Sequence, residues 1–245
     1  MNGVSFSVRR ITISAVFLSI SLVLKTTLTF DLPLFGQNGL RIGISGVFSI
    51  LPALLFGPVY GAAVSGLSDF LGYLIKPVGA YLPLLTVTAA AGGFLRGLLW
   101  RWLQDKDGGR MRLLIAAGSV VLLVLGVGSG PAAGEEMQTA AAGVTGSAIL
   151  GILLLTGDFF LSQKLRSGKG QRKIPQLFVV MVVSGLVVTT VNTVILRETI
   201  GAAWKMIPFL IVWMPRAAEE LLGNMVLTYF IALLLPLSGK LLKNG

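Results

Sequence analysis

The stretch LLFGPVYGAAVSGLSDFLGYLIKPVGAYLP, residues 54–83, places a single acidic residue, Asp69, in an apolar run rich in glycine. Gly57-Pro58 predicts the end of one helix and the start of another, because proline cannot continue the preceding helix. After this break, small residues recur every three to four positions, at Gly61, Ser65, Ser68 and Gly72. This spacing predicts a stripe of small side chains on one helix face, as close helix packing inside a membrane requires.

Asp69 is the polar residue of this helix that needs an explanation. A carboxylate is costly in hydrocarbon unless it faces the interior of a helix bundle or a water-filled cavity. A loop with tyrosine, proline and glycine follows at 77–83. The stretch therefore predicts one wall of a solute site.

The composition predicts an all-α integral membrane protein. The 245 residues are 54% hydrophobic and 12% charged, with a mean hydropathy of +0.86, too apolar for one water-soluble core. The pI of about 10.3 comes from short basic clusters between apolar runs, a pattern typical of membrane topology signals rather than nucleic-acid binding. Cysteine and histidine do not occur, which excludes thiol chemistry and nearly all zinc sites.

The apolar segments predict about eight transmembrane helices in a single membrane domain, residues 1–245. The expected helices are 11–29, 41–56, 58–74, 83–102, 113–128, 144–160, 178–196 and 216–235. Residues 29–40 are expected to form a loop, and 41–56 a helix too short to span the bilayer. The fifth and sixth segments predict a helical hairpin at about 113–163.

The placement of lysine and arginine predicts that both termini are cytoplasmic. Basic residues gather before the first helix, in the turns 101–112 and 164–173, and in the C-terminal tail. The tip of the hairpin carries Glu135 and Glu136 and is expected outside. This arrangement agrees with the positive-inside rule and predicts a multi-pass protein of the cell membrane.

One polar stripe on the last helix suggests a binding site near its outer end. Arg216, Glu219, Glu220 and Asn224 have the spacing i, i+3, i+4 and i+8, which places them on one face. A guanidinium presents a planar fork suited to a carboxylate, and a carboxylate can accept hydrogen bonds from a heteroaromatic ring edge. The other interpretation is a mutually neutralising ion group inside the membrane.

Further residues are expected at the same outer end. Arg41 and Asp69 come from the short helix and its neighbour, and four aromatic residues could stack on a flat ring: Tyr73, Tyr81, Trp204 and Trp213. Each aromatic residue alone could instead belong to an interfacial belt. Together the residues suit an anionic, heteroaromatic small molecule. No catalytic triad, hydrolase carboxylate pair, metal cluster or phosphate loop occurs, so we expect no enzyme activity, cofactor or metal.

Ala15 and Ser19 form a small-xxx-small pair on the first helix. The pair indicates either ordinary packing within the bundle or a docking face for a partner membrane subunit.

The chain resembles the substrate-binding S components of energy-coupling-factor (ECF) vitamin transporters, most closely the folate type. The matching residues are Leu55-Phe56-Gly57-Pro58, Gly61, Gly66, Asp69, Gly72-Tyr73, Tyr81-Leu-Pro83 with Thr86, Asn192-Thr193, Pro215-Arg216, and Ala15 with Ser19. The resemblance covers roughly residues 9–104 and 175–240. The family has a six-helix fold, to which this chain adds the hairpin 113–163. Pro83-Leu-Leu-Thr86 stands where the folate type usually has Pro-Gly-Phe-Thr.

The resemblance implies an outward-facing subunit that binds a vitamin such as folate and topples to release it inside. It adds Asn192 to the expected substrate site and makes Ala15 and Ser19 the docking residues. The implied partners are a transmembrane coupling subunit and two cytoplasmic ABC-type ATPases.

Other interpretations stay open at this point. Asp69 also permits an ion-coupled secondary transporter of a small organic solute, although the two halves show no inverted repeat. An S component for another vitamin or a nucleobase-like ligand is possible. A membrane scaffold that binds no solute and an intramembrane enzyme are the remaining alternatives.

Overall fold

The computed structural model describes residues 7–34, 37–43, 45–77, 79–128, 141, 144–146, 148–149, 151–152, 173–199, 205 and 208–243. Side chains are described for these residues except within 29–42, 125–128 and 237–243. The chain divides into two compact units, Met1–Arg101 and Trp102–Gly245.

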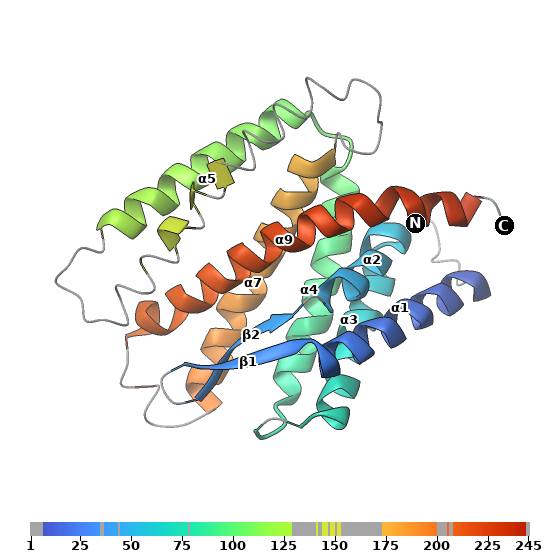
Figure 1. The fold of residues 1–245 in the computed structure, drawn as a ribbon, viewed down its shortest axis with the longest axis horizontal. Helices are drawn as coiled ribbons and strands as arrows, with labels where there is room; N and C mark the ends of the chain where they lie inside the picture. The colour runs from blue at the N-terminus through green and yellow to red at the C-terminus, as the bar shows by residue number, and fades with distance from the viewer. Residues whose placement is uncertain are drawn as a thin grey trace. The chain divides into compact units, whose positions relative to one another are not determined.

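The first unit contains four helices and a two-stranded sheet among its described residues (Figure 1). The elements are α1 (Val8–Thr27), β1 (Thr29–Leu34), β2 (Gln37–Gly43), α2 (Gly46–Phe56), α3 (Pro58–Ile75) and α4 (Pro83–Leu103), whose last two residues lie beyond the unit boundary. The expected break between α2 and α3 is confirmed. Gly57 ends α2 with φ +100°, a backbone conformation that favours glycine, and Pro58 is the first residue of α3.

The expected loop at 29–40 is wrong, because this segment contributes to an antiparallel hairpin. β1 pairs with β2 from Thr29↔Gly43 to Leu34↔Gln37, with an irregularity between Leu32 and Pro33. Thr29–Leu34 alternates polar or proline residues with Phe30, Leu32 and Leu34, which is the period of a strand. The expected helix 41–56 is corrected with it: β2 continues to Gly43, and α2 begins at Gly46.

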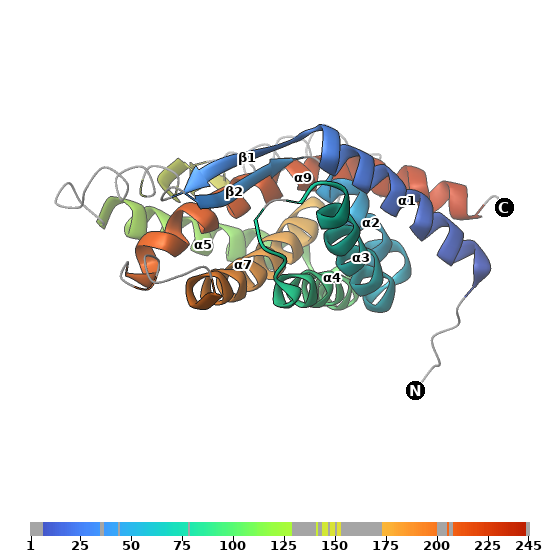
Figure 2. The ribbon, with the colours of Figure 1, turned by 90° about the horizontal axis from the view of Figure 1, so that it is seen from below.

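The core of the first unit forms around α2. Most of its side chains are buried, and Leu51 is only 1% exposed. α1, α2 and α3 pack against one another (Figure 2). At a rise of about 1.5 Å per residue, the 11 residues of α2 fall well short of a bilayer core of about 30 Å, as the sequence predicts.

The small-residue stripe of α3 packs against three different helices. A side chain at Gly61 would collide with the Gly93 carbonyl oxygen of α4 and with Ala53 of α2, so the backbones approach closely there. About two and three turns further along, Ser68 and Gly72 lie against side chains of α1. The stripe is therefore occupied by packing within the unit.

The second unit contains three long helices among its described residues. These are α5 (Gly108–Gly128), α7 (Ile174–Thr199) and α9 (Phe209–Lys243), and α7 packs against both α5 and α9. The expected separation of 207–215 from a last helix starting at Arg216 is wrong. Pro215 lies inside the continuous α9, as membrane helices tolerate when their surroundings satisfy the freed carbonyl.

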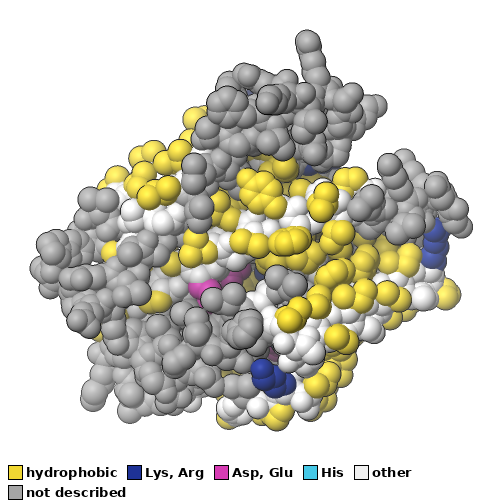
Figure 3. Space-filling view, viewed as in Figure 1, with side chains coloured by type: hydrophobic (Ala, Val, Ile, Leu, Met, Phe, Trp, Pro, Cys, Tyr) yellow, Lys and Arg dark blue, Asp and Glu magenta, His cyan; other side chains and the backbone are white. Residues whose placement is uncertain are grey.

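Three of the described helices are long and apolar enough to cross a membrane: Pro83–Leu103, Ile174–Thr199 and Phe209–Pro236. Large apolar side chains remain exposed on several helices, including Leu84 and Val87 of α4 and Val191 of α7. Hydrophobic side chains cover wide areas of the face drawn in Figure 3. A hydrocarbon environment accounts for this exposure better than water does.

Candidate functional site

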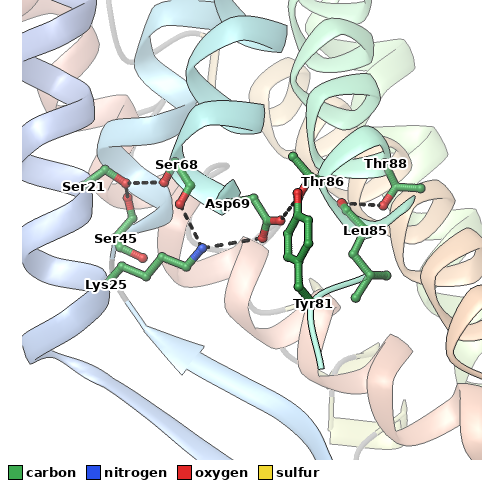
Figure 4. A network of polar contacts seen from close by, with 9 residues as sticks. All are labelled: Ser21, Lys25, Ser45, Ser68, Asp69, Tyr81, Leu85, Thr86 and Thr88. Carbon is green, nitrogen blue, oxygen red and sulfur yellow. Dashed lines mark hydrogen bonds and ion pairs between the residues drawn. The ribbon is translucent and has the colours of Figure 1, made fainter. Parts of the chain in front are cut away.

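Asp69 is held by side chains from two other helices of the first unit (Figure 4). Its Oδ1 lies 3.6 Å from the Lys25 Nζ of α1, and its Oδ2 accepts a 2.8 Å hydrogen bond from the Thr86 hydroxyl of α4. The Lys25 and Asp69 side chains are 17% and 32% exposed, so the ion pair is only partly screened by solvent. The sequence predicts that Asp69 turns inward from α3. In the structure its carboxylate faces Lys25, a cation that was not among the expected site residues.

Lys25 could have been found from the sequence by its position. It is the one charged residue of the expected helix 11–29, and such residues pair with an opposite charge when they lie inside a bundle. Its Nζ also donates to the Ser68 carbonyl oxygen at 3.1 Å. The lysine stem passes over Gly72, where an added Cβ would lie 2.8 Å from Nζ.

Tyr81 continues this group of contacts from the segment before α4. Its phenol oxygen lies 3.0 Å from Thr86 Oγ1. Because Thr86 has one hydroxyl hydrogen and donates it to Asp69, Tyr81 must be the donor to Thr86. We call Lys25, Ser68, Asp69, Tyr81 and Thr86 the Lys25–Asp69 network.

Two further aromatic rings surround Tyr81. The Tyr73 and Phe70 ring centroids lie 5.0 Å and 5.9 Å from the Tyr81 ring centroid. The Tyr73 hydroxyl donates to the Gly79 carbonyl oxygen at 3.1 Å and so attaches α3 to the turn before α4. The structure therefore brings together three of the expected site residues, Asp69, Tyr73 and Tyr81.

The second unit carries its polar side chains along the contact between α7 and α9. Trp213 Nε1 donates to Thr190 Oγ1 at 2.9 Å, and Arg216 Nε donates to Thr193 Oγ1 at 3.1 Å. The Thr189 hydroxyl donates to Glu220 Oε2 at 3.2 Å. Three side chains of α9 thus each contact a threonine of α7: Trp213, Arg216 and Glu220.

Asn224 completes this row of contacts two turns after Arg216. Its Nδ2 donates to Glu220 Oε1 at 2.9 Å and to the Met181 carbonyl oxygen of α7 at 3.2 Å. A side chain at Gly185 would collide with Glu220 Oε1 and Asn224 Nδ2, so glycine leaves the space that these groups fill. We call the contact formed by Thr189, Thr190 and Thr193 with Trp213, Arg216, Glu220 and Asn224 the threonine seam.

The threonines were the part of this seam that sequence reasoning missed. They form the run Thr189-Thr190-Val-Asn192-Thr193, in which polar residues share one side of an otherwise apolar helix. Thr193 is fully buried, whereas Asn192 beside it and Glu219 beside Glu220 are half-buried. Four expected site residues of α9 therefore face α7 in one row.

Two expected residues have a different status. Arg41 lies in β2 opposite Asp31, so its expected place at the end of a short helix is wrong, and its side chain is outside the described residues. Trp204 is also outside the described residues. The structure gives the other candidates as two groups, one in each unit.

The expected docking residues lie on an exposed part of α1. Ala15 and Ser19 are both exposed, and the Ser19 hydroxyl donates to the Ala15 carbonyl oxygen at 2.9 Å. This bond satisfies the serine within its own helix and leaves a smooth surface at the pair. Among the described residues, no group of three or more acidic side chains could hold a metal ion.

Comparisons with known proteins give a family and one relative. A family model described as "ECF-type riboflavin transporter, S component" matches residues 5–130. A curated relative, "Folate transporter FolT" from Clostridium novyi (strain NT), is 29% identical over 110 residues. These residues make up 45% of this chain and 59% of the relative, so the match spans less than two thirds of the relative's length. No solved structure matches the chain.

Proposed function

The chain belongs to the family of ECF-type riboflavin transporter S components, and we propose that it binds a vitamin-like solute outside the cell for uptake. The solute of first choice is folate or a related anionic heteroaromatic molecule, because the relative is named a folate transporter. Riboflavin is the second candidate, because it appears in the description of the family. The family consists of transporter components and not of enzymes.

The threonine seam is the observation that carries this proposal. A guanidinium, a carboxylate and an amide in apolar helices cost free energy and are usually retained for function. Trp213 is fixed by Thr190, which sets the plane of a ring on which a flat solute can stack. Arg216 presents the planar fork that a solute carboxylate requires, and Glu220 with Asn224 suits a heteroaromatic ring edge.

We also propose Asp69, Tyr73 and Tyr81 of the first unit as substrate-binding residues, together with Arg41, Asn192 and Glu219. The three aromatic rings near Asp69 support it, since they offer apolar faces beside a charged group. The alternative is that the chain is an S component for another vitamin or a nucleobase-like ligand. In that case the same residues bind the different solute.

The chain forms one membrane domain of about eight transmembrane helices in this proposal, with the hairpin 113–163 added to a six-helix S component. Both termini are cytoplasmic and the solute site opens outward. The distribution of lysine and arginine supports this orientation.

The partners are a transmembrane coupling subunit and two cytoplasmic ABC-type ATPases. The exposed pair Ala15 and Ser19 supports docking through α1. Replacing both by tryptophan should prevent co-purification of the coupling subunit and abolish uptake. Ile20→Trp, on another exposed stripe of α1, is the matched control. Normal co-purification and uptake in the double variant would remove these residues from the interface.

The experiment for the solute starts with mass spectrometry of molecules extracted from the purified chain. Calorimetry then compares folate and riboflavin, with Arg216→Ala against the exposed control Arg110→Ala. We expect Arg216→Ala to weaken binding by about tenfold or more, as loss of a charged hydrogen-bond donor does. Unchanged affinity would remove Arg216 from the site, and no binding of either vitamin would contradict both solute assignments.

An ion-coupled secondary transporter is the competing function. Uptake into vesicles that persists without ATP and without the coupling subunit would favour it.

A further inference from the structure

Lys25 connects the last turn of α1 to α3 in the first unit. Its Nζ contacts Asp69 Oδ1 and the Ser68 carbonyl oxygen, both on α3. One turn earlier on α1, the Ser21 hydroxyl donates to the Ser45 carbonyl oxygen at 3.1 Å and lies 3.3 Å from Ser68 Oγ. The end of α1 is therefore attached to α3 and to the start of α2 by polar contacts.

The contacts continue from Asp69 to the turn before α4. Thr86 donates to the Asp69 oxygen that Lys25 does not contact, and Tyr81 donates to Thr86 (Figure 4). The carboxylate thus uses one oxygen toward each neighbouring helix. A rotation of the carboxylate breaks both contacts, because its two oxygens are fixed to each other.

Gly72 is a geometric requirement for this arrangement. Its missing side chain leaves the space through which the Lys25 stem reaches Asp69, and an added Cβ would lie 2.8 to 2.9 Å from three lysine atoms. The free ends of a lysine can move away at little cost. A side chain at 72 therefore displaces the ammonium without disturbing the helix backbone.

We infer that Lys25 is a positioning residue that fixes Tyr81 and residues 79–82 through Asp69 and Thr86. This inference rests on the proposed function, in which Tyr81 lines the solute site and α1 docks the coupling subunit. The network then makes the position of the Tyr81 ring depend on α1. A movement of α1 on docking is transmitted to the solute, and occupation of the site is transmitted to the docking helix.

The experiment needs no solute. The chain contains no cysteine, so Ala80→Cys provides a single exposed position for a nitroxide label. Lys25→Met in the full chain should make the label at 80 more mobile in electron paramagnetic resonance spectra, and Lys25→Arg should restore the wild-type spectrum. Thr26→Val is the control on the same turn, because its hydroxyl donates to carbonyls of α1 itself.

Gly72→Ala provides a second test if Lys25→Met fails to fold. We expect the same increase in mobility at 80, because the displaced ammonium no longer contacts Asp69. Unchanged mobility in the folded Lys25→Met or Gly72→Ala variant would overturn the inference. Equal mobility changes in Lys25→Arg and Lys25→Met would also contradict it, since only the methionine variant removes the charge.

Calorimetry separates this inference from the proposed function. Lys25→Met should lower the affinity for the vitamin that binds the wild-type chain, folate or riboflavin, by about tenfold, or 1.4 kcal/mol. Lys25→Arg should keep the wild-type affinity. A mobility change at 80 in a chain that binds neither vitamin would support the positioning role and reject the proposed solutes. Normal vitamin binding with no mobility change would reject the positioning role alone.

Discussion

In the first unit, the polar contacts described around Asp69 centre on its ion pair with Lys25, whereas in the second unit those described between α7 and α9 follow a row of threonines on α7. In the first unit a cation and an anion neutralise each other across two helices. In the second unit the hydroxyls of α7 accept from Trp213 and Arg216 and donate to Glu220. The hydroxyls of α7 thereby contact the charged side chains of α9, and Glu219 and Glu220 also interact electrostatically with Arg216 within α9 itself.

This difference has a physical consequence for what each region can do. An ion pair draws its two helices together and resists separation, because either charge alone is costly in an apolar environment. A threonine hydroxyl can rotate between donating and accepting, so a seam of threonines can accept a new charged partner with a smaller loss. We therefore propose that Lys25 positions Tyr81 through Asp69 and Thr86, and that the threonine seam contacts the charged groups of the solute.

The largest expected effect comes from replacing Gly185 by alanine, and the same substitution at Gly72 provides the comparison. Gly185→Ala places a Cβ against the hydrogen-bonded ends of Glu220 and Asn224 and 2.9 Å from Glu220 Cδ. We expect a loss of about 3 kcal/mol or more, at the upper end of the usual cost of overpacking, seen as a lower midpoint of thermal unfolding in detergent. Gly72→Ala displaces only the end of the Lys25 side chain, which is partly exposed to solvent, so it should lower the midpoint less than Gly185→Ala. Equal losses would contradict the difference in packing between the two sites.

An intermediate effect is expected from neutralising each carboxylate. Asp69→Asn and Glu220→Gln each replace one carboxylate oxygen by an amide nitrogen, which donates hydrogen bonds and cannot accept them. Asp69→Asn also removes the charge opposite Lys25, so it should cost about 1.5 to 3 kcal/mol. Glu220→Gln should cost about 1 kcal/mol, because Glu219 still supplies a negative charge one position away. Thermal unfolding measures both, and the reverse order would argue against the ion pair as the stronger element.

The smallest effect is expected from single hydrogen bonds in the two regions. A double-mutant cycle of Trp213→Phe with Thr190→Val should give a coupling of about 0.6 kcal/mol, typical of interhelical hydrogen bonds in membranes. The cycle of Tyr81→Phe with Thr86→Val should exceed it, because Thr86 also donates to the charged Asp69. Unfolding of the four variants of each cycle gives both couplings. A larger value for Trp213 would contradict the cooperative role given to Thr86.

Much of the fold could be predicted from local pattern. The Gly57-Pro58 break, the short α2 and the bounds of α4 follow from residues within each element, and the structure agrees with them. The hairpin at 29–43 was missed although Phe30, Leu32 and Leu34 alternate, because Pro33 and the nearby glycines resemble a loop. The continuous α9 was missed for a related reason: proline interrupts helices in water more often than in membranes.

The candidate site was predictable only in part. The spacing of Arg216, Glu220 and Asn224 identified one helix face, and the structure shows that this face meets α7. The residues that it meets could not be derived from spacing, since they lie 23 to 43 positions away along the chain. For the same reason Asp69 was recognised as a polar residue in need of a partner, but Lys25 was not identified as that partner.

By itself the sequence determined that this chain is apolar, helical and built for a membrane, and where its small and charged residues recur. Those properties depend on hydropathy and on the 3.6-residue period, which act over one or two turns. Only the tertiary structure decided that Lys25 crosses Gly72 to reach Asp69 and that threonines of α7 meet the charges of α9. Such pairings depend on how helices are juxtaposed, and helix packing is determined by the shapes of whole surfaces rather than by any local run of residues.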